Sequence, residues 1–382
     1  MKSVMPFFIS IVLVFLLSCQ PAEQHLEITS GEELQEAVDS LLTDHVSLDA
    51  PGASILIAYD GDMLIGKGYG LSNYSGRVPV RPTTNFRMAS VSYQFTALCV
   101  LKLIDLKLIF PTQDVGKILD AKPLEGVQVQ HLLHHTSGIP EYDEAFSNWN
   151  KPEIPQNEDV LNWYRENGTP LYEPGTQFNY SNGGYNLLAT LVEKVTGVQF
   201  EEFARKQIFL SNGMLTSLYY NLGNPAEMHE RAYCYEKKDG KWSQVDGNLL
   251  NGLVGEGGVY TSVRDYFQFD RQLRMAKVLD GDANNLIFAT DDIELEDYSD
   301  QFDFLKPGNA KYAAGWFVQG DKAFHGGLWY GTSTMVVHDL SRPLTIAVFR
   351  NTNEPVDQLI NELYKIADSY INYLEKEGYY GN

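Results

Sequence analysis

Strand-like segments lie at both ends of this 382-residue chain and enclose a long middle of different character. Residues 52–71 have the pattern of two strands joined at Asp60-Gly61, a dipeptide typical of a tight hairpin turn. Three further segments with strand patterns come only near the other end, at residues 313–319, 333–340 and 344–351. A fold that unites these segments must bring both ends of the chain into one sheet.

Helical patterns flank and separate the strands. Ser30 and Glu33 have capping-box spacing at the start of residues 30–46, and residues 353–374 close the chain as an amphipathic helix. We therefore predict an α/β (α+β) fold, in which helices flank an antiparallel sheet and a mainly helical lobe is inserted into it. The expected sheet lobe covers about residues 29–82 and 308–382, and the helical lobe covers about 83–307. A ligand would bind in the crevice between such lobes.

The first 18 residues have the pattern of an export signal. Lys2 precedes an apolar run, residues 5–17, that is too short to cross a bilayer comfortably. The run ends in LLSC, which resembles the lipobox of bacterial lipoproteins; an ordinary secretory signal or a short anchor is the alternative. We predict that residues 1–18 are removed, that Cys19 carries lipid and that residues 19–28 form a tether. The protein would then be exported and anchored to the bacterial cell envelope, facing the periplasm or the cell surface.

Acidic residues outnumber basic residues by 50 to 29, which gives a formal net charge of −21 at pH 7. Nucleic-acid phosphates need basic surfaces, so this balance excludes a nucleic-acid partner. Nine acidic residues and no basic residue lie within residues 278–305. The spacing of a calcium-binding EF-hand is absent there, and we interpret the segment as a solvated surface excursion.

Ser90 lies in the segment FRMASVSYQFTALCVLKLI, residues 86–104, where a long apolar helix is expected to begin. The free N–H groups and the dipole of a helix N-terminus stabilise negative charge, which suits a serine nucleophile and its oxyanion. Taken alone, however, Ser90 is better explained as a helix N-cap. The interpretation therefore depends on other parts of the chain.

Four more segments carry residues that suit the same chemistry. They are residues 127–142 (VQVQHLLHHTSGIPEY), 172–197 (with Tyr180-Ser181-Asn182), 255–270 (GEGGVYTSVRDYFQFD) and 322–337 (with His325-Gly326-Gly327). With residues 86–104, these blocks resemble in content and order the beta-lactamase-related serine hydrolases, which include class C beta-lactamases, DD-peptidases and related esterases. The resemblance runs from about Gly52 to Asn351. It implies that residues 29–382 form one beta-lactamase/transpeptidase-like unit.

The resemblance assigns roles to the first two motifs. Ser90 takes the position of the nucleophile, which attacks a carbonyl carbon to form an acyl-enzyme. Tyr180 takes the position of the acid/base, and Asn182 that of the residue that holds the substrate amide. A small-molecule or peptide substrate and the absence of a cofactor follow from the same resemblance.

The third motif, His-x-Gly on a strand beside the serine, is matched by His325 and Gly327. The resemblance implies that the backbone N–H groups of Ser90 and Leu328 form the oxyanion hole. Each of these residues alone has a bland explanation as a loop or strand-end residue. Their occurrence together in family order favours a site.

The chain departs from the family at the third residue after the nucleophile. The family has Ser-x-x-Lys, whose lysine helps remove the serine proton, whereas residues 90–93 read SVSY and place Tyr93 at that position. Lys102 is twelve residues from Ser90, about 18 Å along a helix, and cannot substitute. Without a nearby cation, we expect Tyr180 to titrate near the ordinary tyrosine pKa of about 10. Both candidate bases are then weakened.

Two other routes for the proton are open. His325 could act as the general base in a Ser90–Tyr180–His325 arrangement, because an ordinary histidine titrates near neutral pH. Tyr93 could instead relay a proton as one of a tyrosine pair with Tyr180. The sequence thus predicts an exported serine hydrolase that cleaves an ester or amide through an acyl-enzyme on Ser90, with an altered base. The alternative is a catalytically impaired relative that serves as a ligand-binding lipoprotein.

Histidines and cysteines indicate neither a metal site nor a disulfide framework. His131 and His135 have the i, i+4 spacing that can chelate zinc on a helix, but the glutamate of an HExxH motif is absent. The resembled family commonly has a structural turn at this point, and we predict no metal. Cys99 falls inside an apolar helix, and its spacing from Cys234 does not demand pairing.

Overall fold

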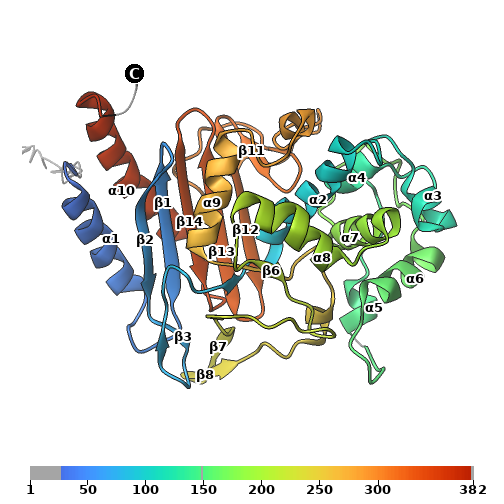
Figure 1. Cartoon of the computed structure of the whole chain (residues 1–382), viewed down its shortest axis with the longest axis horizontal. Coiled ribbons are helices and arrows are strands. Elements are labelled where there is room, and N and C mark those ends of the chain that lie inside the picture. Colours follow the sequence, from blue (N-terminus) through green and yellow to red (C-terminus); the bar gives the residue numbers. More distant parts are fainter. Residues whose placement is uncertain (1–26, 148, 380–382) are drawn as a thin grey trace, which may run out of the picture.

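The computed structural model describes residues 27–147 and 149–379. Its centre is a seven-stranded sheet in which all neighbours are antiparallel (Figure 1). Five strands come from the C-terminal part of the chain and two from the N-terminal part, which confirms the predicted fold class. In order across the sheet they are β10 (Lys311–Tyr312), β11 (Phe317–Gln319), β12 (Lys322–Trp329), β13 (Thr332–Asp339), β14 (Leu344–Arg350), β1 (Ala53–Tyr59) and β2 (Asp62–Tyr69).

The hairpin predicted at Asp60-Gly61 joins β1 to β2. Both turn residues have positive φ, 48° and 83°, which is the backbone that a two-residue hairpin with right-handed twist requires. On its other side β1 pairs along its whole length with β14, from Ala53 opposite Arg350 to Tyr59 opposite Leu344. The first strand of the chain is therefore held between its sequence neighbour and the last strand.

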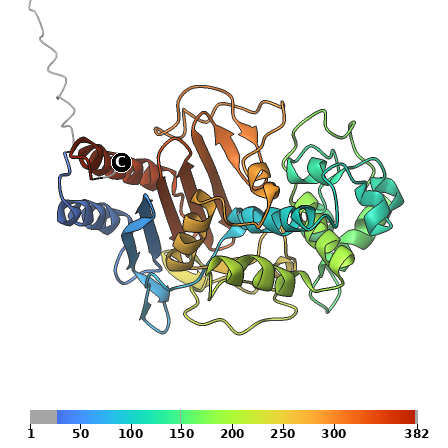
Figure 2. The same cartoon turned by 45° about the horizontal axis from the view of Figure 1, so that its top comes forward.

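Both faces of the sheet are covered. Ile55 and Ile57 of β1 belong to an apolar cluster with α1 (Gly31–His45) and α10 (Asp357–Lys376), which lie side by side (Figures 1 and 2). Leu56 and Ala58 point to the opposite face and join a second cluster that includes α9 (Val263–Arg274) and the helical region. This alternation follows from the two-residue period of a strand.

The middle of the chain forms a mainly helical region beside the β12 side of the sheet (Figure 1). Its helices are α2 (Tyr93–Asp105), α3 (Val115–Leu119), α4 (Val129–Leu133), α5 (Asp143–Ser147), α6 (Asn157–Asn167), α7 (Asn182–Thr196) and α8 (Phe200–Ala204). Short strands connect this region to the main sheet: β3 (Leu71–Asn73) with β4 (Val78–Pro79), β5 (Phe86–Arg87) and β6 (Leu218–Tyr219) with β9 (Val259–Thr261), and β7 (Tyr235–Lys238) with β8 (Lys241–Gln244).

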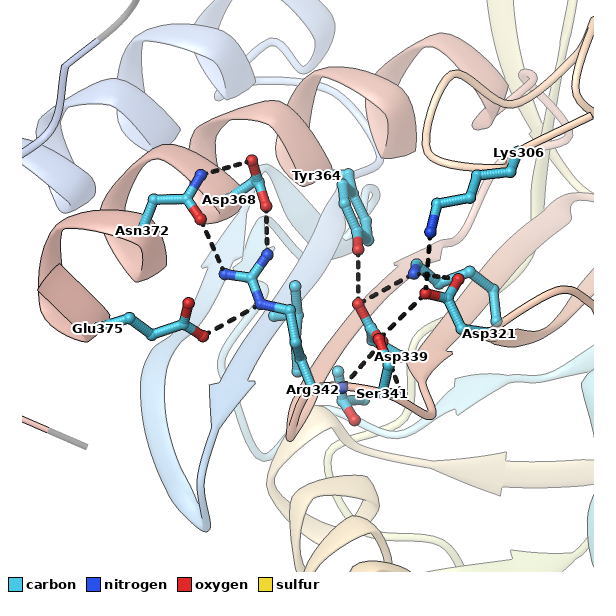
Figure 3. Close-up of polar contacts among 12 residues, drawn as sticks. Lys306, Asp321, Asp339, Ser341, Arg342, Tyr364, Asp368, Asn372 and Glu375 are labelled. Carbon is cyan, nitrogen blue, oxygen red and sulfur yellow. Dashed lines mark hydrogen bonds and ion pairs between the residues drawn. The ribbon is translucent and has the colours of Figure 1, made fainter. Parts of the chain in front are cut away.

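A polar network fastens α10 to the end of β13 (Figure 3). The Asp339 carboxylate accepts hydrogen bonds from Tyr364 of α10 at 2.9 Å and from the Ser341 hydroxyl at 2.8 Å, and it pairs with the buried Lys322 at 3.1 Å. Arg342 extends the network along α10, where its guanidinium bonds Asp368 at 2.6 Å and Glu375 at 3.2 Å. The buried Lys322 also pairs with Asp321 at 2.7 Å, so two carboxylates compensate its charge, and Lys322 in turn compensates the charge of the buried Asp339.

The charge of segment 278–305 led us to expect a solvated surface excursion, but the structure shows that part of the segment is buried. Phe302 and Leu305 are buried against the sheet face that carries α10, and Val278 and Leu279 join the other core cluster. Tyr298 and Phe302 also line a cavity of about 490 Å³. The apolar residues between the acidic ones fold inward, so the segment forms a wall of the molecule.

The predicted export signal and Cys19 lie outside the described residues, as do residues 20–26 of the tether. Within residues 27–147 and 149–379, none of the helices is both long enough and apolar enough to cross a membrane. Cys99 and Cys234 are buried and free.

Candidate active site

Ser90 lies in a 3₁₀ turn, Ala89–Ser92, that leads directly into α2. The preceding Ala89 has φ +47°, a left-handed conformation that alanine rarely adopts and that is often found beside functional residues. The Ser92 hydroxyl accepts the Val259 N–H at 3.2 Å, and Thr334 donates to the Met88 carbonyl at 2.9 Å. These bonds fix the turn between the helical region and the sheet.

Strand β12 passes close beside this turn, and Gly327 makes the approach possible. A Cβ atom at Gly327 would lie 2.4 Å from the Met88 carbonyl oxygen and 3.1 Å from the Ser90 backbone nitrogen. A side chain there would push β12 away from Ser90. At Gly326 the nearest atom to such a Cβ is the Met335 sulfur, at 3.5 Å, so that position is open. The two glycines of the His-x-Gly motif therefore differ in what they allow.

Tyr180 and Asn182 are presented at the start of α7. Ser181 caps this helix and its hydroxyl accepts the Gly184 N–H at 3.1 Å. The backbone N–H of Ser181 in turn donates to Nδ1 of the buried His135 at 3.1 Å, and the His135 ring lies 4.5 Å from that of Tyr180. Burial holds the pKa of His135 well below its usual range. A neutral His135 therefore positions the Tyr180–Asn182 segment.

Tyr93 is completely buried behind these residues. Its ring stacks on Tyr185 of α7, with centroids 4.1 Å apart and an interplanar angle of 23°. Its hydroxyl donates to Oδ1 of Asn182 at 2.5 Å. Tyr93 thus links the helix that follows Ser90 to the second motif.

Asn182 fixes the direction of one hydrogen bond in the site. An amide oxygen can only accept, so Tyr93 donates its single hydroxyl proton to Asn182. The rings of Tyr93 and Tyr180 lie beside each other, with centroids 5.5 Å apart. Ser90 and Tyr180 line the same cavity, whereas Tyr93 does not line it.

The site raises the pKa of both tyrosines. Burial raises the pKa of Tyr93 well above the ordinary value, and the neighbouring Tyr180 and Glu256 raise it further. Burial also raises the pKa of Tyr180 by more than hydrogen bonding with Ser90 and Tyr93 lowers it. The expectation that Tyr180 titrates near its ordinary pKa is therefore wrong. Desolvation opposes the phenolate, and Tyr180 is a neutral phenol at neutral pH.

His325 lies on β12 near both tyrosines, but its ring nitrogens have other partners. Its Nδ1 lies 2.6 Å from the Gly326 carbonyl oxygen, to which it donates, and its Nε2 accepts from the Tyr312 hydroxyl at 3.1 Å. Burial lowers the pKa of His325 to about 4. The geometry gives His325 no direct hydrogen bond to Ser90 or Tyr180, and it supports the site as a neutral, packed side chain.

Two cavities meet at Ser90. The larger, of about 490 Å³, is lined by four more residues predicted for the site, namely Tyr180, His325, Gly327 and Leu328. The smaller, of about 30 Å³, is lined by Asn182. Ser90 and Leu328 border both. The structure thus brings together all the predicted residues of the site, with Tyr93 enclosed behind them.

Sequence reasoning missed an acidic cluster next to Asn182. Glu256 lines the smaller cavity, accepts a hydrogen bond from Tyr142 and has a buried Oε2 with no partner among the described residues. Burial raises the pKa of Glu256 to about 8, with Asp143 and Glu141 adding to the effect. Burial likewise raises the pKa of Glu141. The only sequence signal was the occurrence of Glu141 and Glu256 in two of the motif blocks.

The histidine cluster has structural roles. His131 Nδ1 accepts the Gln128 N–H at 3.2 Å in a capping box of α4, and His134 lies 3.5 Å from Asp291. His135 bonds Ser181, as described above. Across the described residues, no group of three or more His, Cys, Asp or Glu side chains is arranged to hold a metal ion.

The family model named Beta-lactamase matches residues 34–370, and the chain therefore belongs to the Beta-lactamase family. This is the class of serine hydrolases and penicillin-binding-protein-like proteins to which the fold and the arrangement around Ser90 also correspond.

Within the family, the chain is similar to two curated relatives. It is 28% identical over 326 residues to penicillin-binding protein 4* of Bacillus subtilis strain 168, covering 80% of this chain and 69% of the relative. It is 24% identical over 348 residues to protein flp of Staphylococcus aureus strain N315, covering 86% and 66%. The chain thus spans about two thirds of the length of these relatives.

Two solved structures show the same fold. The octameric penicillin-binding protein homologue from Pyrococcus abyssi has a TM-score of 0.73 and 26% identity, covering 88% of this chain and 76% of that one. FmtA from Staphylococcus aureus has a TM-score of 0.71 and 19% identity, covering 90% and 91%.

Proposed function

We propose that this protein is an exported serine hydrolase that cleaves an ester through an acyl-enzyme on Ser90. One observation carries the proposal: Ser90 and Tyr180 line the same cavity, while Tyr93 is buried behind them and leaves that cavity open. A residue that disarmed the site by filling it would lie in the cavity. Tyr93 instead supports Asn182.

In this proposal Tyr93 occupies the lysine position of the Ser-x-x-Lys motif and performs one of the functions that a lysine could perform there. Either side chain can donate a hydrogen bond to Oδ1 of Asn182. Tyrosine brings no positive charge, however, so nothing at this position favours a Tyr180 phenolate. Tyr180 must act while neutral.

A neutral Tyr180 can move a proton without storing one. As the Ser90 oxygen bonds the ester carbonyl carbon, the serine proton passes to the Tyr180 oxygen. The proton that Tyr180 held passes to the leaving alcohol oxygen as the bond between that oxygen and the acyl carbon breaks. Tyr180 is a neutral phenol before and after the step. Water then attacks the acyl-enzyme, gives a proton to Tyr180 and receives the acyl group, and Tyr180 returns a proton to Ser90.

The backbone N–H groups of Ser90 and Leu328 are our candidates for the donors to the carbonyl oxygen. Both residues border the two cavities, so a carbonyl between the cavities would lie against them. Donors placed where negative charge develops typically contribute a factor of about 100 to 1,000 in rate. This contribution does not depend on the missing cation.

An ester suits this machinery better than an amide. An ester oxygen leaves more readily than an amide nitrogen, which must be protonated fully before it departs. A neutral phenol is a weak acid and does not transfer its proton fully before the bond breaks. The loss of a strong general base typically lowers the rate by a factor of about 10²–10⁴. We therefore expect turnover of esters and little cleavage of peptides.

A serine-directed fluorophosphonate probe followed by intact mass tests the proposal. The parent protein should be labelled stoichiometrically, and Ser90→Ala should not be labelled. A parent that stays unlabelled while Tyr93→Lys becomes labelled would show a disarmed enzyme. A fluorescent penicillin run alongside tests whether a beta-lactam acylates this chain, which is similar to a protein named as penicillin-binding.

The alternative is a ligand-binding lipoprotein that has lost catalysis. It is favoured by one group of observations, namely the raised pKa of Tyr93 and Tyr180 and the low pKa of His325, which leave no strong base in the site. Retention of the open cavity next to Ser90 would then serve binding alone. The probe experiment separates the two functions.

We also infer that Cys19 carries the lipid that holds the domain on the cell envelope. The apolar run that ends at this residue supports the inference. A Cys19→Ser variant should appear in the soluble fraction of the cell envelope, whereas the parent should stay with the membranes. Equal membrane association of both would overturn the anchor.

A further inference from the structure

The two cavities that meet at Ser90 differ in size and in the residues that line them, and each is lined by one residue of the second motif. Tyr180, which delivers the proton to the leaving group, lines the larger cavity. Asn182 lines the smaller one on the other side of Ser90. If Tyr180 protonates the leaving oxygen, the alcohol part of the ester lies in the larger cavity and the acyl part in the smaller.

The larger cavity is built for an apolar group. Its walls include Phe302, Phe317, Phe324 and Met335, and Val356 contributes from the segment that precedes α10. The Phe317 and Phe324 rings stack with centroids 5.7 Å apart and an interplanar angle of 21°. A volume of about 490 Å³ with such walls is typical of a site that encloses most of a ligand.

The same cavity is unsuited to an anion. Of the described residues that line it, none is Lys or Arg, and Asp357 is the one carboxylate. Asp357 also occupies the first turn of α10, the position where a helix would otherwise favour a bound anion, and it accepts a hydrogen bond from Gln301 at 3.2 Å. A substrate carboxylate would meet this negative charge in a protein that is already strongly acidic.

The smaller cavity admits only a short group. Its volume of about 30 Å³ is room for about two water-sized groups. Leu253 and Trp329 border it, and the Trp329 indole N–H donates to Asn251 at 2.8 Å, which fixes the ring. An acyl chain longer than a few atoms would have to displace this wall.

We propose that the substrate is an ester of a short acyl group with a large, uncharged, apolar alcohol. This inference rests on the proposed function, because it uses Tyr180 to decide which cavity receives the leaving group. It differs from a substrate that ends in a carboxylate, as penicillins and peptide C-termini do. The acidic segment 278–305 contributes to the preference for an apolar alcohol, because its Tyr298 and Phe302 line the larger cavity.

Three esters of matched size test the inference. Hexyl acetate and ethyl hexanoate are isomers that exchange the long and short sides of the ester. In 6-acetoxyhexanoate the alcohol of hexyl acetate ends in a carboxylate. We expect kcat/KM for hexyl acetate to exceed that for each of the other two by about tenfold or more, because each buried methylene contributes severalfold and a buried carboxylate is disfavoured. Hydrolysis is followed by pH-stat.

Competition between each ester and the fluorophosphonate probe tests the same order of preference without requiring turnover of the ester. Labelling of Ser90 should be slowed most by hexyl acetate. If the protein is labelled but ethyl hexanoate or 6-acetoxyhexanoate is equal to or better than hexyl acetate, this inference is overturned and the proposed function stands. If the parent is not labelled and no ester is cleaved, the proposed function fails, and this inference fails with it.

A surface substitution checks the role of charge. Asn353 is exposed and lines the larger cavity near Asp357. Asn353→Lys should raise kcat/KM for 6-acetoxyhexanoate relative to hexyl acetate by about fivefold, the effect of one surface charge at close range. An unchanged ratio in a folded variant would show that the lack of a cation does not set the preference.

Discussion

The hydroxyl of Tyr93 lies 2.5 Å from Oδ1 of Asn182, so the residue three positions after the candidate nucleophile orients the amide of the second motif. The Asn182 Nδ2 group then faces the carboxylate of Asp143 at 3.5 Å. This arrangement gives Tyr93 a positioning role that does not require it to exchange protons with substrate.

Tyr93→Phe should reduce kcat/KM for an acetate ester by about 10- to 100-fold, because Asn182 loses the donor that orients its amide. The ring and its stacking on Tyr185 would remain, so the free energy of unfolding should fall by only about 1–3 kcal/mol. Tyr185→Phe is a matched control, since its hydroxyl donates to the Leu133 carbonyl at 2.8 Å rather than to Asn182. Equal kinetic losses in both variants would contradict the positioning role.

Gly327→Ala should abolish labelling of Ser90, while Gly326→Ala should be labelled at nearly the parent rate. The new methyl at residue 327 would approach the Met88 carbonyl oxygen and the Ser90 nitrogen, whereas the methyl at residue 326 would make an ordinary contact with Met335. Rates of fluorophosphonate labelling measure the difference, and far-ultraviolet circular dichroism checks the fold. The close approach of β12 would be unimportant if both variants reacted alike.

Glu256→Gln should stabilise the protein at pH 8 and change its stability little near pH 4. Burial raises the pKa of Glu256 to about 8, whereas an unfolded glutamate has a pKa of about 4.3. The folded state therefore holds a proton that the unfolded state releases, and parent stability falls as pH rises through that window. Glutamine cannot titrate, so the variant avoids this loss, and its free energy of unfolding at pH 7–8 should exceed that of the parent by about 3 kcal/mol. Melting temperatures measured across the pH range should diverge; parallel curves would refute the buried protonated acid.

Asp339→Asn should lower the free energy of unfolding by about 2 kcal/mol at pH 7, because the buried Lys322 would lose one of its two carboxylate partners and keep only Asp321 at 2.7 Å. Burial alone would raise the pKa of Asp339, but hydrogen bonds from Ser341, Lys322 and Tyr364 hold it below its ordinary value. This stabilisation is present above the unfolded pKa of about 3.9 and is lost as pH falls through the folded pKa. Urea unfolding at pH 7 and pH 3 should show the variant's deficit shrink in acid.

The matched control for Asp339 is an exposed ion pair on a helix. Glu202 pairs with Lys206 at 2.5 Å on the surface. Glu202→Gln should leave the free energy of unfolding nearly unchanged, since solvent screens such pairs. A deficit as large as that of Asp339→Asn would mean that burial of the network is not what makes it stabilising.

The sheet and the motif residues could be predicted because their signals are local. Alternating apolar residues and the Asp60-Gly61 turn mark β1 and β2, and the motif blocks place Ser90, Tyr180 and His325 in family order. Each motif block lies on or next to a helix or strand that ends near Ser90, and the motif residues therefore meet in the fold.

What could not be predicted depends on tertiary burial. Nothing in the local sequence shows that Glu256 would lie close to Asn182, or that Tyr180 would be desolvated enough to raise its pKa. The acidic composition of residues 278–305 also concealed the inward-facing Tyr298 and Phe302. Charge counts describe the segment as a whole, whereas single aromatic residues decide which side of it faces the cavity.

The pairing of Ala53 with Arg350 has a consequence for how the chain reaches its folded state. Strand β1 is made early, yet one of its edges stays open until β14 has been synthesised, which gives the fold a high contact order. During that interval an apolar strand edge is exposed and can pair with other chains. Folding of this chain therefore depends on protection of its N-terminal hairpin, and truncations that remove residues after 343 should aggregate rather than yield a smaller domain.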